Sequence, residues 1–487
     1  EGWAKSLRQI ISLLYAGEIP KWDVQRVRPA GSRLKTFGGR ASGPGPLEEL
    51  FKFVIAKFKN ASGRRLNSLE CHDILCKIGE VVVVGGVRRS AMISLSNLSD
   101  QRMAKAKSGE WWNKEGQRAL ANNSVCYTET PEVGAFLNEW TSLYESKSGE
   151  RGIFNRVASQ SQAARNGRRK SDVDFGTNPC SEIILRPYQF CNLSEVVVRS
   201  EDTQSILENK VRLATIIGTF QSTLTNFPYL RKIWQKNTEE ERLLGVSLTG
   251  IMDNEDLVSG KIDLNRLKEV AIQTNKEWAD ILGINPSCAI TCVKPSGTVS
   301  QLVDSASGLH ARHSPYYIRT VRADNKDPMT QFMKEASIPN EPDVTKPENT
   351  TVFSFPIRSP EGSLCRADQT AIQQLEFWKR VQEEWCEHKP SVTISVKENE
   401  WPSVGGWVYD NFSIISGISF LPYSDHSYRQ APYQECSKEE YEAMKSKMPK
   451  EIIWSDLSYY EKEDGTPGTG TFACSADGSG CEVVDLT

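Results

Sequence analysis

The spacing of hydrophobic residues predicts several amphipathic helices along the chain. Between residues 47 and 59 the apolar side chains recur three and four positions apart, which places them on one face of a helix. The same spacing predicts helices over residues 237–253 and 264–282, and a short amphipathic helix that includes residues 9–15. The apolar face of the first of these helices consists of Leu47, Leu50, Phe51, Val54, Ile55 and Phe58.

Other segments carry the pattern of strands. Residues 69–84 are typical of a helix that runs into a buried strand of four valines, which Gly85 and Gly86 end. A second extended segment begins at residue 87, and residues 391–397 alternate between apolar and polar side chains as a half-buried strand does. Mixed helix and strand signals continue to residue 300, so the pattern predicts an α/β fold.

Glycine, proline, serine and arginine mark the connecting segments. Residues 28–46 are rich in these four types and predict a loop, and a shorter break follows at residues 60–65. From residue 464 to the end the chain is rich in glycine, serine and threonine and carries two cysteines, which is typical of a flexible arm. No fixed-period repeat is evident.

Composition narrows the class of protein. The 487 residues include 59 Lys and Arg against 62 Asp and Glu, and the net charge of -3 excludes a globally basic nucleic-acid-binding protein. Hydrophobic residues make up 38% of the chain, which argues against wholesale disorder. The length allows about three domains or one large α/β barrel. No apolar stretch approaches the ~20 residues that a membrane span needs.

The cysteines and the first residue bear on compartment and completeness. Twelve cysteines in a chain this long do not make a disulfide scaffold. Those that stand alone, such as Cys126, Cys288 and Cys386, indicate reduced thiols and a cytoplasmic protein. The chain begins with Glu1 and shows no signal peptide, and we expect that its true N-terminus is absent.

The segment NPCSEI, residues 178–183, carries the most informative chemistry. If it is extended, Asn178, Cys180 and Glu182 point to the same side and set a thiol beside a carboxylate and an amide. Cys191 follows a predicted turn, so a chain that doubles back could place it opposite Cys180. This set suits redox or radical chemistry better than hydrolysis, because no histidine lies nearby. The alternative is a buried cysteine next to a surface glutamate.

Two further segments suggest phosphate binding. Residues 294–300, KPSGTVS, follow an apolar strand, and such small residues leave backbone N–H groups free to hold a phosphate. The alternative is an ordinary turn. Residues 31–44 and 62–68, with Arg88 and Arg89, concentrate basic residues, for which a solvated surface is the alternative.

Together these motifs resemble a known enzyme family. NPCSEI followed by FCNL is similar to the active-site loop of ribonucleotide reductases. From about residue 20 to the end, motifs occur in the order of the monomeric, adenosylcobalamin-dependent (class II) ribonucleoside-triphosphate reductases. They are GSRLKTFGGRASGP, GGVRRSAMISL, ANNSV, KPSGTVSQL, GLHARHSPYYIRTVR and GISFLPYSDHSYRQAPYQE. The resemblance implies a ten-stranded α/β barrel of two antiparallel five-stranded half-sheets, with the loop at residues 178–182 as a finger through its centre.

The resemblance also implies a role for each residue of the loop. Cys180 would carry the thiyl radical that removes the 3′-hydrogen of the substrate, and Glu182 would be the general base at the 3′-hydroxyl. Asn178 would bind the substrate by a hydrogen bond. Cys191 would be one of two thiols that reduce the 2′ position and end as a disulfide. The radical would come from adenosylcobalamin, because no side chain generates one unaided.

Ligands and partners follow from the same resemblance. The substrate would be a ribonucleoside triphosphate whose phosphates contact Ser296, Gly297, Thr298 and Val299. A deoxynucleotide effector would bind the first basic segment, and the residues expected there are Arg33, Lys35, Arg40 and Ser42. Residues 47–85 resemble the insertion by which monomeric members imitate a dimer contact, so we expect a monomer.

The C-terminal arm would complete the redox cycle. Cys474 and Cys481 would reduce the active-site disulfide by thiol exchange and would in turn be reduced by thioredoxin. Their spacing does not match a zinc site. His310 and His313 have no evident third ligand, so we expect a structural role and no metal ion bound by side chains. Asp425-His426 lacks the pattern by which a histidine replaces the base of cobalamin.

The family's second reducing thiol lies upstream of the effector loops. Cys71 and Cys76 do not fit that position, so we expect the partner of Cys191 to be missing from an N-terminally incomplete chain. The expected divisions are an effector and insertion region at 1–90, a catalytic barrel at 91–425, a cobalamin-proximal region at 426–463 and a redox-active tail at 464–487.

Two alternatives stay open. A class I large subunit would receive its radical from a second protein through a tyrosine pair, for which Tyr316-Tyr317 and Tyr459-Tyr460 are candidates in sequence contexts unlike class I. The other alternative is an inactive fragment that binds nucleotides without turnover.

Overall fold

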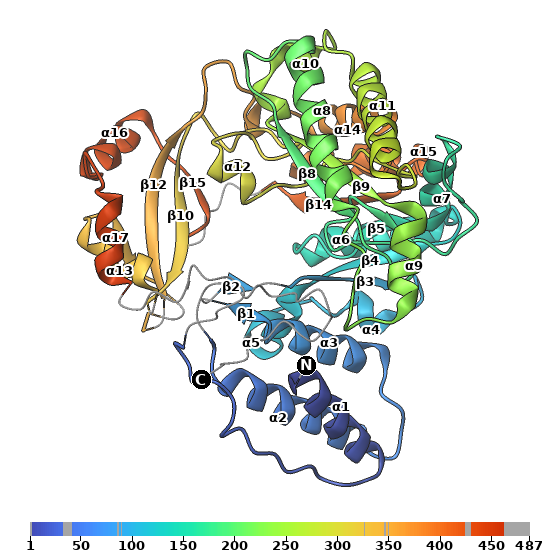
Figure 1. The fold of residues 1–487 in the computed structure, drawn as a ribbon, viewed down its shortest axis with the longest axis vertical. Coiled ribbons are helices and arrows are strands. Elements are labelled where there is room, and N and C mark those ends of the chain that lie inside the picture. The colour runs from blue at the N-terminus through green and yellow to red at the C-terminus, as the bar shows by residue number, and fades with distance from the viewer. Residues whose placement is uncertain are drawn as a thin grey trace.

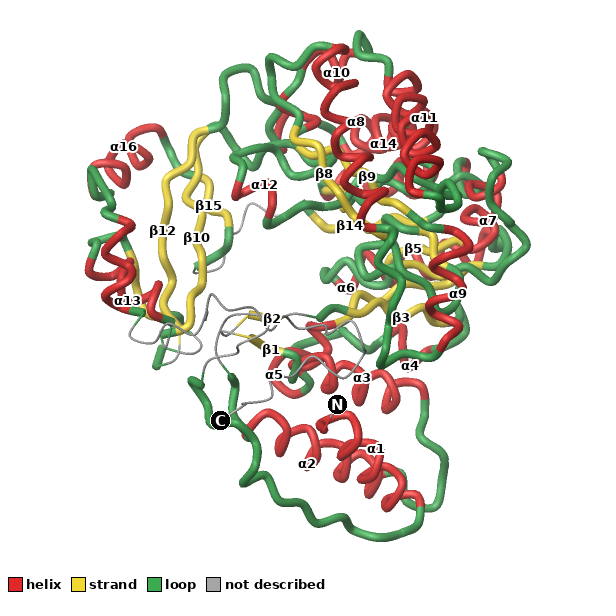
Figure 2. The backbone as a smooth tube through the Cα atoms, viewed as in Figure 1, coloured by secondary structure: helices red, strands yellow, loops and turns green. Residues whose placement is uncertain are grey.

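The fold is known from a computed structural model of the chain. It describes residues 2–32, 41–84, 87–88, 90–325, 327–344, 347–348, 350–423 and 430–461. The strands fall into two main groups, shown in yellow in Figure 2, with helices around them.

The first group is built on a five-stranded sheet in the order β13-β14-β5-β4-β3 (Figure 1). β3 (Met92–Ser96), β4 (Ala121–Tyr127) and β5 (Gly152–Asn155) run parallel to one another. β14 (Gly417–Pro422) is antiparallel to β5, and β13 (Thr393–Val396) is parallel to β14. The sheet therefore consists of two parallel halves that run in opposite directions.

Further parallel pairing extends the second half. β8 (Asn192–Val197) pairs with β9 (Leu244–Thr249), a bridge joins Val246 to Thr291, and another joins Val293 to Pro390 just before β13. The extended residues 289–293 thus link β9 to the five-stranded sheet. The predicted α/β fold class is confirmed. The strands of the described residues do not close into a barrel, and the ten-stranded barrel stays a prediction.

Helices connect the parallel strands and cover the sheet. α6 (Val133–Ser146) joins β4 to β5, α8 (Gln204–Gln221) and α9 (Lys232–Glu241) join β8 to β9, and α15 (Trp401–Asp410) joins β13 to β14. The apolar faces of α6, α8 and α15 meet the strands in one large core cluster. The remaining elements of this part are α4 (Gln101–Ala104), α5 (Trp111–Lys114), η1 (Gly116–Leu120), α7 (Arg156–Ala164), β6 (Gly176–Thr177), β7 (Ile184–Leu185), η2 (Ile251–Asp253), α10 (Glu255–Ser259), α11 (Leu264–Leu282), α12 (Val299–Leu302), η3 (Arg366–Asp368), α14 (Ala371–Glu384) and η4 (Glu398–Glu400).

A separate four-stranded sheet, at the left of Figure 1, has the order β11-β12-β10-β15. β10 (Tyr316–Asp324) pairs with both β12 (Thr350–Arg358) and β15 (Tyr433–Glu435), and β11 (Asn340–Pro342) pairs with β12. This sheet combines strands from both sides of the boundary expected at residue 425. Its helical elements are α13 (Pro328–Glu335), α16 (Lys438–Lys447), η5 (Trp454–Asp456) and α17 (Leu457–Tyr460).

The N-terminal part is helical and lies at the bottom of Figure 1. It contains α1 (Gly2–Tyr15), α2 (Gly45–Asn60), α3 (Ser68–Glu80) and the two-stranded pair β1 (Val83–Val84) and β2 (Val87–Arg88). α3 begins with a capping box, in which Asn67 and Glu70 bond to each other's backbone N–H groups. The helices predicted near residues 9–15 and 47–59 are confirmed.

One predicted helix is wrong over half its length. α9 ends at Glu241, and residues 244–249 of the predicted helix 237–253 form β9 instead. All six residues of β9 are buried, and a continuous apolar run does not distinguish a buried strand from a helix. The helix at residues 264–282 and the strand within residues 391–397 are confirmed as α11 and β13.

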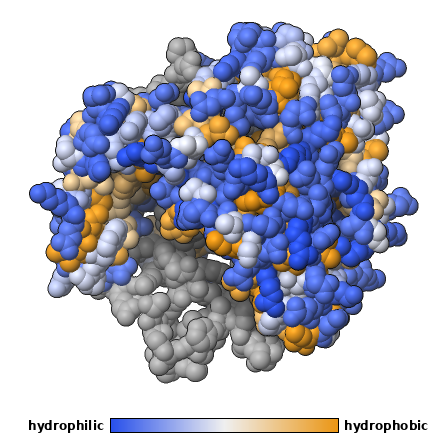
Figure 3. Space-filling view, turned by 90° about the horizontal axis from the view of Figure 1, so that it is seen from above, coloured by the Kyte–Doolittle hydropathy of each residue, from blue (hydrophilic) through white to orange (hydrophobic). Residues whose placement is uncertain are grey.

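The surface in Figure 3 is mostly hydrophilic, with scattered apolar residues. Within the described ranges, no helix is both long and apolar enough to cross a membrane.

Candidate active site

The segment NPCSEI forms a tight turn between β6 and β7, which pair in the antiparallel sense. The Ser181 backbone N–H donates to the Asn178 carbonyl (2.9 Å), and Ser181 has the left-handed backbone angle φ of 64°. The Asn178 side-chain oxygen accepts a hydrogen bond from the Ile183 N–H (2.9 Å). The prediction of an extended segment is therefore wrong, because the asparagine side chain and a reversed backbone close the turn locally.

Three backbone carbonyls of this turn accept hydrogen bonds from residues far away in the sequence. Asn122 Nδ2 of β4 donates to the Pro179 carbonyl (2.7 Å), and Ser391 Oγ donates to the Cys180 carbonyl (2.6 Å). The Lys389 backbone N–H donates to the Glu182 carbonyl (3.0 Å). The turn is thus held by β4 on one side and by the approach to β13 on the other.

The turn borders a cavity of about 110 Å³ inside the strand array. Each of the five strands β3, β4, β5, β13 and β14 contributes to its wall, and Pro179, Cys180 and Ser181 line it from the turn. The strand residues are Ile93, Asn122, Ser124, Ile153, Thr393, Gly417, Ile418 and Ser419. Residues of the turn and of all five strands thus line the same cavity, as expected for a loop inserted among the strands.

Within the turn, Cys180 and Glu182 differ in exposure. Cys180 is exposed, whereas Glu182 is only 2% exposed and its Oε2 atom has no hydrogen-bond partner. This is the reverse of the alternative with a buried cysteine and a surface glutamate. Desolvation by the surrounding strands, together with the charge of Glu182, raises the pKa of the Cys180 thiol above its ordinary value. Cys180 is therefore a thiol, open to solvent, at the mouth of a cavity.

Cys191 immediately precedes β8. Burial raises the pKa of its thiol well above the ordinary value, and the charge of Glu182 adds to this effect. Glu182 thus lies near enough to affect both thiols. Cys180, Glu182 and Cys191 thus form one electrostatic neighbourhood, and the roles expected for them stay predictions.

Lys389 is a member of this neighbourhood that sequence reasoning missed. Its side chain has 0% exposure, and its Nζ lies 2.9 Å from Ser181 Oγ and 3.3 Å from Thr177 Oγ1. Burial lowers the pKa of the Lys389 ammonium to about 7, against an opposing effect of Glu182. A lysine before a strand is ordinary in sequence, so no local signal distinguishes it.

The segment predicted to bind phosphate turns at Ser296, which has a φ of 52°, and enters α12. Within the described part of the chain, the backbone N–H groups of Gly297, Thr298 and Val299 have no acceptor. No atom lies within 4 Å of where a side chain at Gly297 would begin. These groups are free to bind an anion.

Glu195 on β8 is a second carboxylate that the sequence did not single out. It accepts hydrogen bonds from Ser247 Oγ (3.3 Å) and from the hydroxyl of Ser296. Burial raises its pKa, although the bond from Ser296 and the charge of Lys294 oppose this. Glu195 therefore connects β8, the strand that follows Cys191, to the phosphate segment.

Several predicted residues lie outside the described ranges, namely Arg33, Lys35 and Arg40 of the effector set, Asp425-His426 and both tail cysteines, Cys474 and Cys481. Ser42 is described. It lines a hollow whose wall also carries Lys21, Arg26 and Arg28.

His310 and His313 lie in local contacts. The two ring nitrogens of His310 lie 3.0 Å from the Ser307 carbonyl and 3.1 Å from the Thr393 N–H, and His313 stacks on Tyr433. In the part of the chain that the structure describes, no three His, Cys, Asp or Glu side chains are arranged to hold a metal ion.

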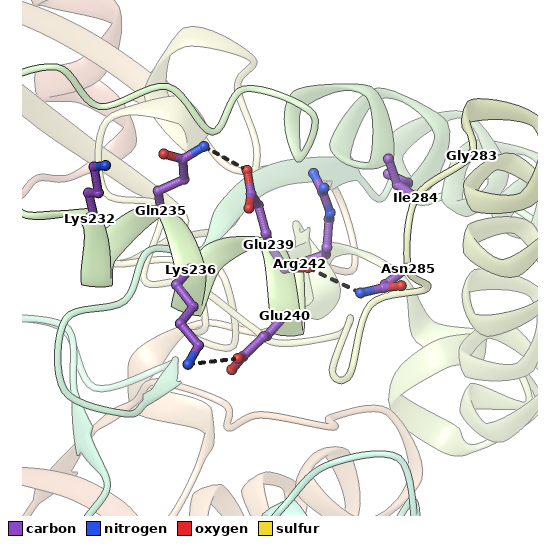
Figure 4. Close-up of a pocket in the computed structure, with 9 residues that line it drawn as sticks. All are labelled: Lys232, Gln235, Lys236, Glu239, Glu240, Arg242, Gly283, Ile284 and Asn285. Carbon is purple, nitrogen blue, oxygen red and sulfur yellow. Dashed lines mark hydrogen bonds and ion pairs between the residues drawn. The ribbon is translucent and has the colours of Figure 1, made fainter.

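A hollow of about 410 Å³ lies away from this site, between α9 and the residues after α11 (Figure 4). Gln235 donates to Glu239 (2.9 Å), and Lys236 lies 3.9 Å from Glu240. Because these carboxylates already have partners on α9, the hollow offers no argument for a ligand.

Comparison with known proteins gives a consistent result. No protein-family model matches the chain. The adenosylcobalamin-dependent ribonucleoside-triphosphate reductase of Lactobacillus delbrueckii subsp. bulgaricus is 29% identical over 91% of this chain, and that of Lactobacillus acidophilus is 27% identical over 99%. The chain spans 64% of the first relative's length and 69% of the second.

A solved structure agrees with these relatives. A crystal structure of a B12-dependent (class II) ribonucleotide reductase matches 90% of this chain with a TM-score of 0.69 and 25% identity, and 64% of that chain is covered. Sequence and fold together confirm that the chain resembles the adenosylcobalamin-dependent, class II ribonucleotide reductases over about two thirds of their length.

Proposed function

We propose that the protein reduces ribonucleoside triphosphates to 2′-deoxyribonucleoside triphosphates by a thiyl radical mechanism. The observation that carries this proposal is the turn at Cys180 and Glu182. There the exposed thiol of Cys180 lines a cavity walled by five strands, and two residues further on Glu182 is a buried carboxylate with one unpartnered oxygen. The likeness to relatives that bear this activity in their names supports it.

In this mechanism Cys180, Glu182 and Cys191 each carry out a different step. The sulfur of Cys180, as a thiyl radical, takes the 3′-hydrogen atom of the ribose, and the Glu182 carboxylate accepts the proton of the 3′-hydroxyl. The 2′-hydroxyl then leaves as water. Cys191 and a second thiol supply two hydrogens, one to the departing water and one to C2′, and form a disulfide, so that the ribose is reduced and the thiols are oxidised. Cys180 then returns the 3′-hydrogen atom and Glu182 returns the proton, which restores the thiyl radical and the carboxylate.

Adenosylcobalamin is the cofactor in the relatives' names, and the exposure of Cys180 is the feature of this structure that fits it. Cys180 is exposed while Glu182 is buried, so a bulky cofactor has access to the sulfur from the solvent side without displacing the base. Cys180 is the residue that it would face. When bound, adenosylcobalamin supplies the organic radical chemistry that side chains cannot.

The substrate phosphates would bind the free N–H groups of Gly297, Thr298 and Val299. Glu195 accepts a hydrogen bond from Ser296, the residue just before them. The cations around Ser42 support a deoxynucleotide effector site there. The same proposal includes thioredoxin as reductant of the tail, a monomeric state, a second thiol that pairs with Cys191, and the ten-stranded barrel.

The test is turnover by the protein expressed from its complete reading frame. Deoxynucleotide formation is measured by chromatography with a dithiol, with and without adenosylcobalamin, in the dark and after light. We expect activity that requires the cofactor and is lost on illumination. Activity that requires a second protein subunit instead would favour the class I alternative, and nucleotide binding without turnover would favour an inactive fragment.

Two cysteine variants separate the assigned roles. Cys180→Ser should abolish exchange of the substrate's 3′-hydrogen with solvent, because a serine oxygen forms no comparably accessible radical. Cys191→Ser should retain this exchange while losing deoxynucleotide formation. Equal loss of 3′-hydrogen exchange in both variants would contradict the separate roles assigned to Cys180 and Cys191.

A further inference from the structure

Lys389 contacts the active-site turn at two points. Its Nζ donates to the hydroxyl of Ser181 (2.9 Å), and its backbone N–H donates to the carbonyl of the next residue, Glu182 (3.0 Å). The same Nζ lies 3.3 Å from Thr177 Oγ1 and 4.8 Å from the centre of the Phe154 ring. Because the side chain is fully buried, water does not compete for these contacts.

Ser181 needs such a partner. Its φ of 64° lies in the left-handed region, which is unfavourable for any residue with a Cβ atom. The packing around its hydroxyl is specific, because a Cβ atom on Gly417 of β14 would lie 2.5 Å from Ser181 Oγ and 3.0 Å from Lys389 Nζ. The glycine on β14 thus leaves the space that the lysine and serine fill.

We infer that Lys389 is a positioning residue that holds Cys180 and Glu182 in place by binding the hydroxyl of the strained Ser181 between them. Lys389 lies on the approach to β13, more than two hundred residues from the turn in sequence. Its effect on turnover rests on the proposed function, whereas its effect on the conformation of the turn does not.

Hydrogen exchange of the full chain tests the conformational effect directly. Lys389→Met leaves an unbranched side chain that is one atom shorter and donates no hydrogen bond. We expect the amides of Ser181, Ile183 and Ile184 to exchange about tenfold faster, which is the effect of losing one well-formed bond. The melting temperature should not fall, because burying methionine is easier than burying an amine. Lys379→Met is the matched control, since it removes the hydrogen bond (3.0 Å) that Lys379 of α14 donates to Asn411, the residue after α15.

Substitutions at Ser181 test whether the lysine acts through this residue. Ser181→Ala keeps the Cβ atom but loses the hydroxyl. It should therefore accelerate hydrogen exchange of the same amides as Lys389→Met does. Glycine adopts a φ near 64° at little cost. In a Ser181→Gly background, Lys389→Met should therefore change the exchange by less than about twofold. An unchanged exchange rate in Lys389→Met, or the same tenfold effect in the glycine background, would overturn the inference.

Kinetics separate this inference from the proposed function. If the protein is a reductase, Lys389→Met should lower kcat about tenfold and leave KM for the nucleotide unchanged, because substrate phosphates bind elsewhere. A normal kcat with a loosened turn would refute the positioning role. If the wild-type protein shows no reductase activity, the proposed function fails, and the exchange measurement still decides what Lys389 does.

Discussion

The candidate site combines side chains of one short segment, which includes Glu182 and Cys191, with residues of the strands around it. Glu182 is on the turn after β6, Cys191 precedes β8 and Gly417 begins β14. Each has a distinct physical state, because Glu182 is buried, the Cys191 thiol has a raised pKa and Gly417 has no room for a side chain. Two predictions follow at the scale of single residues.

Glu182→Gln keeps the size of the side chain and removes the base. We expect turnover to fall by about 10²- to 10⁴-fold, the usual contribution of general acid–base catalysis, with little change in KM. Steady-state kinetics with a ribonucleoside triphosphate and adenosylcobalamin measure this effect. Turnover near that of the wild type would show that another group takes the 3′-hydroxyl proton.

Gly417→Ala should overpack the turn. The new methyl group would lie 2.5 Å from Ser181 Oγ, and we expect a loss of about 1–3 kcal/mol in the free energy of unfolding. Urea unfolding measures this loss. In Ser181→Gly the clashing oxygen is absent, so the same substitution should cost less than half as much. If Gly417→Ala lowered the free energy of unfolding equally in the wild type and in Ser181→Gly, the new methyl group would be clashing with an atom other than Ser181 Oγ.

At the scale of elements, buried ion pairs connect the strands to the segments between them. Arg312 forms two bonds of 2.9 Å with the carboxylate of Asp253 in η2, and both side chains are buried. Asp253 also accepts the Ala306 N–H (2.7 Å), and Arg312 reaches the Asp304 carbonyl (3.2 Å). The pair thus fixes the segment that leads away from α12.

Arg312→Met should leave Asp253 buried without its cation. Breaking such a pair costs about 3–5 kcal/mol, which we expect as the loss in the free energy of unfolding in urea. Adding Asp253→Asn should recover part of it, because the stranded charge is then gone. Lys261→Met, which breaks the exposed Lys261–Asp256 pair (2.8 Å), should have no measurable effect. A loss below 1 kcal/mol for Arg312→Met would show that Asp253 finds another partner or protonates at little cost.

At the scale of the whole molecule, a charged cluster connects the N-terminal helices to the strand array. Asp73 of α3 binds Lys57 of α2 (2.8 Å) and Arg118 of η1 (2.6 Å), the segment that leads into β4. Next to it, His72 Nε2 lies 3.0 Å from Asn123 Oδ1 on β4. Although burial opposes it, hydrogen bonds from Arg118, His72 and Lys57 hold the pKa of the Asp73 carboxyl well below its usual range.

The lowered pKa of Asp73 predicts an acid-sensitive attachment. A carboxyl with a depressed pKa in the folded state stabilises the fold above the unfolded pKa of about 4, and this contribution is lost as the pH falls below that value. Asp73→Asn should therefore destabilise the protein by a constant amount between pH 7 and about pH 4, and by less at lower pH. Urea unfolding over this range measures the difference. A difference that grows on acidification would contradict the assigned sign.

The sequence by itself determined the local elements and the chemistry of the turn. The spacing of apolar residues predicted α2, α11 and β13, since burial of one face imposes a period that any fold must satisfy. The motif around Cys180, Glu182 and Cys191 supplied the chemistry of the proposed function, and the comparisons in sequence and in fold confirmed the resemblance to class II reductases. These features depend on residues close together in the chain.

Only the tertiary structure decided how that chemistry is held. Residues 244–249 became a strand because they pair with β8 on one edge and with Thr291 on the other, and the packed core buries all six side-chain positions, which no periodicity reports. The bond from Lys389 to Ser181 joins residues 208 positions apart, and that between Ser296 and Glu195 joins residues 101 apart. A buried amine or a raised carboxyl pKa is a property of the surroundings, and the surroundings exist only once the strands have packed.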